Sequence, residues 1–213
     1  HNAAEIWDDV KKLISKILKK NKLVSKDIIS IGITNQRETT VLWNKKTGKP
    51  IYRAIVWQDR RTASLCEKLK KRGIRKKIQK ITGLEIDPYF SATKIKWIID
   101  NVKEGNKNLK NDNLLFGTID TWLLWNLTKG KSHLTDISNA SRTMIYDSQK
   151  EKWSDEILKI LNIPETILPT VVENAFDFGS TKLFGNEISI GGMAGDQQSA
   201  TIGQAFFRKV QSK

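Results

Sequence analysis

Cysteine and histidine are nearly absent from the 213-residue sequence, which has one cysteine, Cys66, and two histidines, His1 and His133. A single thiol excludes an internal disulfide, and so few thiol and imidazole groups argue against a zinc site. Long apolar runs are also lacking, since no stretch approaches the roughly 18 residues of a membrane-spanning helix and no signal-peptide core begins the sequence. These absences predict a cytoplasmic protein that has no metal site and does not bind a membrane.

Acidic residues are scarce relative to basic ones: 23 Asp and Glu stand against 37 Lys and Arg, for a formal net charge of +14. Such an excess can mark a nucleic-acid-binding module. The lysines, however, are spread along helical segments such as "KKLISKILKKNK", without interleaved aromatic residues or a groove-reading motif, which favours solvated helix faces. We therefore expect no specific nucleic-acid partner and keep the nucleic-acid-binding module as the least favoured hypothesis.

Apolar residues make up 38% of the sequence and include seven tryptophans, enough for a packed core. Hydrophobic periodicity indicates strands and helices in alternation, which predicts an α/β fold with a mixed sheet. Gly105 is expected to end the third predicted helix. Helices are expected over residues 4–20, 62–72, 91–103, 118–130, 155–161 and from 196, and strands over 28–34, 39–44, 52–58, 114–117 and 187–195.

A charged pair follows the first predicted strand in "TNQRETT", where Arg37 and Glu38 are neighbours. Successive residues of a strand face opposite sides, so two adjacent charges belong where the strand ends and the backbone turns. The guanidinium supplies a fork of hydrogen-bond donors and the carboxylate supplies acceptors, a combination that suits the hydroxyls of a polyol. A surface ion pair of little energetic value is the alternative.

Two aromatic residues lie beside polar turns. Trp57 comes near the end of a predicted strand in "AIVWQDRRT", and Tyr89 follows a proline in the loop "DPYF". An indole can cover the C–H surface of a small ligand and a phenol can point its hydroxyl into a cleft, whereas core packing is the ordinary role of both. From these residues alone, both interpretations stay open.

Asp196 and Gln197 occur in "GMAGDQQSATIGQ", at the start of the last predicted helix. Unpaired N–H groups at a helix N-terminus favour an ionised carboxylate there. Asp196 is therefore interpreted either as an N-cap residue or as a catalytic base, and the two roles are compatible.

Six stretches, taken together, resemble the glycerol kinases of the FGGY carbohydrate kinase family over nearly the whole sequence, and "NQRET" with "AGDQQ" is highly specific within it. The stretches are "ITNQRETT", "AIVWQDRRT", "DPYFSATKIKW", "FGTIDTWLLWNLT", "TDISNASRT" and "GMAGDQQSATIGQ". The resemblance implies that Asp196 is the catalytic base. It also implies six contacts to glycerol, made by Arg37, Glu38, Trp57, Tyr89, Asp196 and Gln197.

The resemblance further implies a ribonuclease-H-like domain of the actin, hexokinase and Hsp70 ATPase type, with glycerol as acceptor and ATP with Mg²⁺ as phosphoryl donor. Residues 1–205 are expected to form the N-terminal, glycerol-binding domain, without its first strands, which would precede residue 1. Residues 206–213 are expected to begin the connection to a second, nucleotide-binding domain, or to be an aberrant basic tail. That second domain, with most of the nucleotide site, is expected to be absent from the sequence.

Two functional hypotheses follow besides the nucleic-acid-binding module. The first is a glycerol kinase fragment that catalyses ATP-dependent phosphoryl transfer to glycerol, giving glycerol 3-phosphate, and that needs the segments it lacks. The second is a catalytically inactive remnant of a split or decayed gene, with at most weak glycerol binding. A second polypeptide, or another copy of the same chain, is the expected kind of protein partner.

Overall fold

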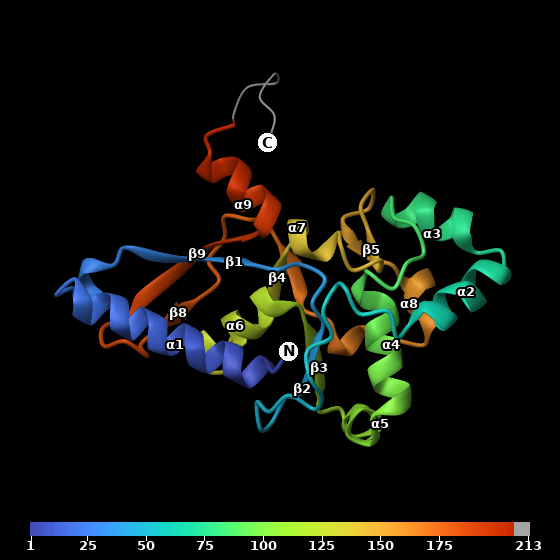
Figure 1. Cartoon of the computed structure of the whole chain (residues 1–213), viewed down its shortest axis with the longest axis horizontal. Coiled ribbons are helices and arrows are strands. Elements are labelled where there is room, and N and C mark those ends of the chain that lie inside the picture. Colours follow the sequence, from blue (N-terminus) through green and yellow to red (C-terminus); the bar gives the residue numbers. More distant parts are fainter. Residues whose placement is uncertain (207–213) are drawn as a thin grey trace.

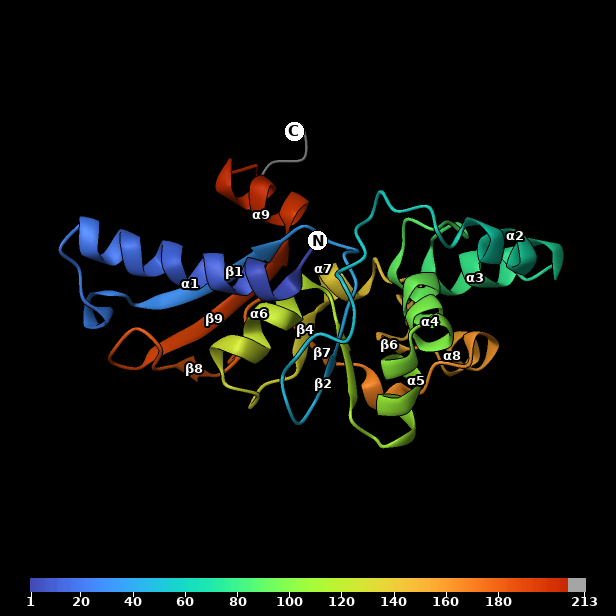
Figure 2. The same ribbon diagram turned by 60° about the horizontal axis from the view of Figure 1, so that its bottom comes forward.

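The computed structural model describes residues 1–206. Figures 1 and 2 place α1 with the strands β1, β8 and β9 at one end of the molecule and the helices α2 and α3 at the other. The helix α9 stands apart from both ends, at the edge of the sheet (Figure 1). The predicted segments fall into two packed bodies. Residues 207–213, where the connection or tail was expected, lie outside the described residues.

A small mixed sheet forms the first body, with strand order β1-β9-β8. Strand β1 (Ser30–Asn35) pairs in parallel with β9 (Ile188–Gly195), and β8 (Ser180–Thr181) pairs with β9 in the antiparallel sense. The helices α1 (Ala3–Lys20) and α6 (Ile119–Leu127) pack together, and the indole Nε1–H of Trp122 on α6 donates to the carbonyl of Ala3. The predicted mixed sheet with flanking helices is thus confirmed.

Helices dominate the second body. Their apolar faces surround a core that includes Ile78, Ile95 and Ile98, each fully buried. The helices are α2 (Ala63–Lys71), α3 (Arg75–Thr82), α4 (Ser91–Asn101), α5 (Lys103–Lys110) and α8 (Asp155–Leu161). Short elements complete the fold: β4 (Leu134–Asp136), α7 (Ile137–Ala140), β5 (Tyr146–Asp147), β6 (Lys152–Trp153), β7 (Thr170–Val172) and the 3₁₀ turns Ser25–Asp27 and Glu165–Ile167.

The antiparallel pair β2 (Val41–Asn44) and β3 (Leu114–Gly117) connects the two bodies. Side chains alternate across a strand, so a strand between two cores can bury both faces. In β2, Val41 and Trp43 belong to the core under the sheet, whereas Leu42 belongs to the helical core. This explains why the three residues Val41, Leu42 and Trp43 are all apolar rather than alternating with polar residues.

Two local expectations were wrong. Residues 52–58 form no strand: Ile55 makes a single bridge to Thr40, and the chain then turns, so the apolar run has no partner strand to extend along. Gly105 does not end a helix but lies within α5, where an added Cβ would stand 2.7 Å from the carbonyl oxygen of Ile98. Glycine there permits the close approach of α5 to α4.

Other expectations are confirmed within one or two residues, as in α1, β1, β2 and β9. Ser154 caps α8, since its side chain accepts a hydrogen bond from the N–H of Ile157. Within residues 1–206, the longest apolar helical stretch falls short of what crossing a bilayer requires. The same residues contain no group of three or more His, Cys, Asp or Glu side chains placed to hold a metal ion.

Candidate functional site

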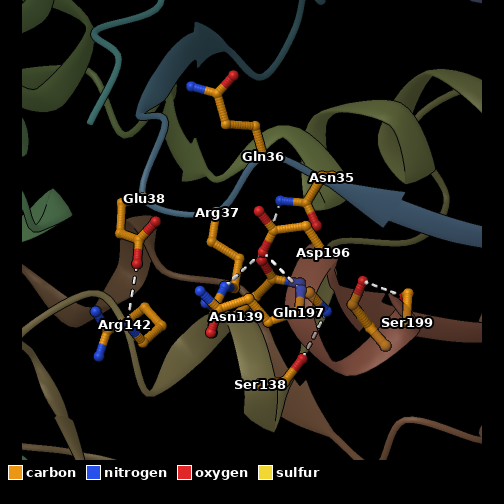
Figure 3. Close-up of polar contacts among 12 residues, drawn as sticks. Asn35, Gln36, Arg37, Glu38, Ser138, Asn139, Arg142, Asp196, Gln197 and Ser199 are labelled. Atoms are coloured by element: carbon orange, nitrogen blue, oxygen red, sulfur yellow. Dashed lines mark hydrogen bonds and ion pairs between the residues drawn. The ribbon is translucent and has the colours of Figure 1, made fainter. Parts of the chain in front are cut away.

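The candidate site lies where β1 and β9 end. Because the two strands are parallel, their carboxyl ends meet at one edge of the sheet, and Asn35 at the end of β1 is in register with Gly195 at the end of β9. The chain leaving β1 therefore brings Arg37 beside Asp196, the first residue of α9 (Asp196–Gly203). Figure 3 shows the two side chains meeting, with Arg37 Nε donating to Asp196 Oδ1 at 2.9 Å.

Asp196 and Arg37 differ in their access to solvent. The side chain of Arg37 is 6% exposed and that of Asp196 is 54% exposed, so a buried guanidinium holds a carboxylate that solutes can reach. Asp196 is not the N-cap of α9, as one of the two interpretations held; Gly195 occupies that position. The N–H of Gln197 also donates to Asp196 Oδ1, which leaves Oδ2 without a hydrogen bond to the part of the chain described.

Glu38 is buried, with 3% exposure, and its backbone has a φ of 60°. That left-handed conformation costs a residue with a side chain about 1 to 2 kcal/mol, so surrounding contacts must hold it. Arg142, which follows α7, supplies one of them, because its Nε donates to Glu38 Oε1 at 2.9 Å (Figure 3). Arg37 and Glu38 are therefore not the surface ion pair that was the alternative interpretation, because both are buried and each pairs with a different residue, Arg37 with Asp196 and Glu38 with Arg142.

Tyr89 and Trp57 form an aromatic wall next to this ion pair. Their ring centroids lie 5.6 Å apart, and the guanidinium of Arg142 lies 5.8 Å from the ring of Tyr89 and 5.0 Å from that of Phe90. Trp57 is 37% exposed, so its indole is available to a solute rather than packed in the core. Contacts thus run without a gap from Asp196 through Arg37 and the adjoining Glu38 to Arg142, Tyr89 and Trp57.

Among the six candidate residues, Gln197 is the one whose side chain makes no hydrogen bond, ion pair or ring contact with this group in the part of the chain that the structure describes. It is exposed and borders, with Asn174, Thr201 and Ile202, a hollow of about 400 Å³ beside α9. The structure therefore brings five of the six candidate residues into one series of contacts and places the side chain of the sixth at its margin.

A buried polar network supports the edge of the sheet from behind. The amide nitrogen of Asn35 donates to Asp120 and to Asn139, and Thr135 donates to Asp120 Oδ2. Burial raises the pKa of Asp120 to about 6. A second branch reaches the start of α9, since the hydroxyl of Ser138 bonds to Asp136 and accepts from the N–H of Gly195 at 2.8 Å.

The residues that sequence reasoning missed lie in stretches already recognised as distinctive. Arg142, Ser138 and Asp136 belong to "TDISNASRT", and Lys94, whose ammonium is close to Glu38, belongs to "DPYFSATKIKW". Their place in these distinctive stretches was the one indication in the sequence that they could belong to the site. Hydrophobic periodicity does not distinguish a buried lysine or arginine from an exposed one.

The class of protein follows from comparison with solved structures. A xylulose kinase from Rhodospirillum rubrum superposes with a TM-score of 0.84 at 15% identity, over 98% of this chain and 43% of that one. The glycerol kinase of Plasmodium falciparum, solved with ADP, superposes with a TM-score of 0.91 at 40% identity, over 97% of this chain and 42% of that one. The fold is that of the sugar kinases, of the actin and hexokinase ATPase type.

Sequence comparison identifies the family. The pattern of the "FGGY family of carbohydrate kinases, N-terminal domain" matches residues 1–203, and the chain belongs to that family. It is 53% identical over 215 aligned residues to the glycerol kinase of Caldanaerobacter subterraneus and 54% identical over 210 to that of Streptococcus pneumoniae. The chain spans 43% and 42% of the lengths of these two relatives.

Proposed function

We propose that this chain forms the alcohol-binding part of a glycerol kinase, in which the hydroxyl of glycerol attacks the terminal phosphoryl group of ATP to give glycerol 3-phosphate and ADP. The observation that carries the proposal is the contact between the partly exposed Asp196 and the buried Arg37, next to the buried Glu38. Relatives that are named glycerol kinases and are more than half identical in sequence support the choice of acceptor.

Glycerol recognition is proposed to use groups of complementary hydrogen-bonding character. The Arg37 guanidinium donates to hydroxyl oxygens and the Glu38 carboxylate accepts from hydroxyl hydrogens. The rings of Trp57 and Tyr89, 5.6 Å apart, are proposed to cover the carbon chain, with the phenol as a further polar contact. A site that pairs every hydroxyl rejects an analogue lacking one, because a buried polar group is then left unpaired.

Asp196 is proposed as the general base. Its Oδ1 is held by Arg37 and the N–H of Gln197, so Oδ2 is the oxygen that accepts the proton. As the bond from the glycerol oxygen to phosphorus forms, the bond from phosphorus to the bridging oxygen of ATP breaks and the hydroxyl proton passes to Asp196. General-base assistance of this kind contributes on the order of 10²–10⁴ in rate. The Gln197 side chain is proposed as a further polyol contact.

ATP is proposed as phosphoryl donor, and Mg²⁺ as the ion that accompanies its phosphates. Within residues 1–206 no cluster of three or more acidic, histidine or cysteine side chains offers a complete site for the ion, so no step above passes through the metal. Residues 1–205 are proposed as the glycerol-binding domain, acting in the cytoplasm. Protein partners, whether a second polypeptide or a second copy of this chain, are part of the same proposal.

Two measurements on the chain test this function. Isothermal titration with glycerol tests binding, and a coupled assay of glycerol-dependent ADP formation tests turnover, with Asp196→Asn compared in both. We expect the variant to bind glycerol but to lose about 10²-fold or more of any turnover. Turnover in the unaltered chain would exclude the inactive remnant, whereas binding without turnover is expected both of the remnant and of a fragment that needs the segments it lacks. Undiminished turnover in the variant would remove Asp196 as the base, and binding of nucleic acid with a steep salt dependence, in place of glycerol, would favour the third hypothesis.

A further inference from the structure

Lys94 is a buried charged residue for which the proposed mechanism has no use. It lies on α4, and its side chain is 0% exposed. Its ammonium Nζ donates to two main-chain carbonyl oxygens, that of Tyr89 at 2.7 Å and that of Glu38 at 3.2 Å. Removing a lysine from water is costly, and burial lowers the pKa of Lys94 to about 8, against the opposing effect of Glu38, Asp59 and Asp87. Such a residue needs a compensating role.

The two carbonyls belong to different parts of the chain. Glu38 lies in the turn between β1 and β2, and Tyr89 lies in the loop that precedes α4. The hydroxyl of Ser91, in the first turn of α4, donates to the same Glu38 carbonyl at 3.2 Å. The start of α4 thus holds the left-handed turn at Glu38 from one side, while Arg142 holds its carboxylate from the other.

We propose that Lys94 is a positioning residue for the polyol site. By donating to the main-chain carbonyls of Glu38 and Tyr89 at once, it sets the separation between the Glu38 carboxylate and the Tyr89 ring. The proposal rests on the proposed function, because it takes these two residues as opposite walls around glycerol. Lys94 touches no substrate atom in this scheme. It acts by donating to two main-chain carbonyls, so methionine, which has a similar length but no hydrogen-bond donor, cannot replace it.

A purely structural role makes a different prediction. If Lys94 only stabilised the fold, its loss would lower the melting temperature without changing how folded molecules discriminate among ligands. If it sets the separation of the two walls, folded molecules lose discrimination, because a displacement of about one ångström spoils simultaneous contact with every hydroxyl.

The test compares Lys94→Met with Lys96→Met in the full chain, the latter removing a lysine two residues away whose partner is the exposed Asp100. Titration calorimetry gives the dissociation constants of glycerol and of propane-1,2-diol. We expect Lys94→Met to weaken glycerol binding by about tenfold to a hundredfold and to reduce the preference for glycerol over the diol, with Lys96→Met unchanged. An unchanged preference in Lys94→Met overturns the proposal. If the unaltered chain binds no glycerol, the proposed function itself fails.

A second measurement needs no variant. In the unaltered chain labelled with ¹⁵N-lysine, the Nζ–H signal of Lys94 below pH 8 should be protected from solvent exchange and should shift as glycerol saturates the site, while that of Lys96 stays in place. A Lys94 signal that glycerol leaves unmoved overturns the proposal even if Lys94→Met does not fold.

Discussion

Gly195→Ala is the most direct perturbation of the contact between Arg37 and Asp196. Gly195 has φ of −61° and ψ of 158°, a conformation that alanine adopts readily, so the backbone should tolerate the change. The added Cβ, however, would stand 2.3 Å from Cδ and 3.0 Å from Cγ of Arg37. Carbon atoms in contact lie about 3.5 to 4.0 Å apart, so the Arg37 side chain must move by roughly an ångström. It has little room, being 6% exposed.

The displacement should break the 2.9 Å hydrogen bond from Arg37 Nε to Asp196 Oδ1. Overpacking of this kind costs about 1 to 3 kcal/mol of stability, and an ångström of misplacement in a site costs up to about 10²-fold in function. We expect Gly195→Ala to lower the melting temperature and to raise the glycerol dissociation constant, both measured on the purified chain by scanning and titration calorimetry.

The matched control is Gly203→Ala at the end of α9, where an added Cβ meets nothing within 4 Å. We expect that variant to bind glycerol normally and to be as stable as the original or slightly more so. If Gly195→Ala binds and melts like Gly203→Ala, then Arg37 is free to move without consequence, and the argument that its position defines the site is refuted.

Two further predictions concern stability. Burial raises the pKa of Asp120 from 3.8 to about 6, so the folded chain binds more protons than the unfolded chain between these values, and the carboxyl lowers the free energy of unfolding as pH rises through that window, by up to about 3 kcal/mol. Urea denaturation at intervals from pH 4 to pH 7 should therefore show the unaltered chain losing stability relative to Asp120→Asn, and parallel profiles would contradict this. Ser154→Ala removes the cap of α8 and should cost about 1 kcal/mol in the same assay; an unchanged denaturation midpoint would show that the cap contributes nothing.

The position of the candidate site was predictable, because it depends on where strands and helices begin and end. The apolar alternation of β1 and the glycines before Asp196 mark the two chain segments whose ends meet. The buried residues that support the candidate residues were not predictable. Lys94 lies in an amphipathic helix, where a lysine ordinarily faces water, and its targets are main-chain carbonyls that carry no sequence signal.

The fold was predictable to a similar depth. Residues 52–58 show the limit, because aromatic and β-branched residues favour a strand but cannot supply the neighbouring strand that a ladder requires. At Gly105 the competing effect was packing, since a Cβ at this position of α5 would stand 2.7 Å from the carbonyl oxygen of Ile98 on α4. Trp57, predicted near the end of a strand, instead lies in a turn beside Tyr89.

The pairing of β1 with β9 has a consequence for the order of events on the ribosome. Arg37 and Asp196 are separated by 159 positions in the sequence, so that many further residues must be translated after Arg37 before its carboxylate partner exists. At about 5 to 20 residues per second, β1 spends on the order of ten seconds without its parallel neighbour. A nascent chain arrested before residue 188 would carry Trp57 and Tyr89, the proposed glycerol contacts, but would lack Asp196, the proposed base.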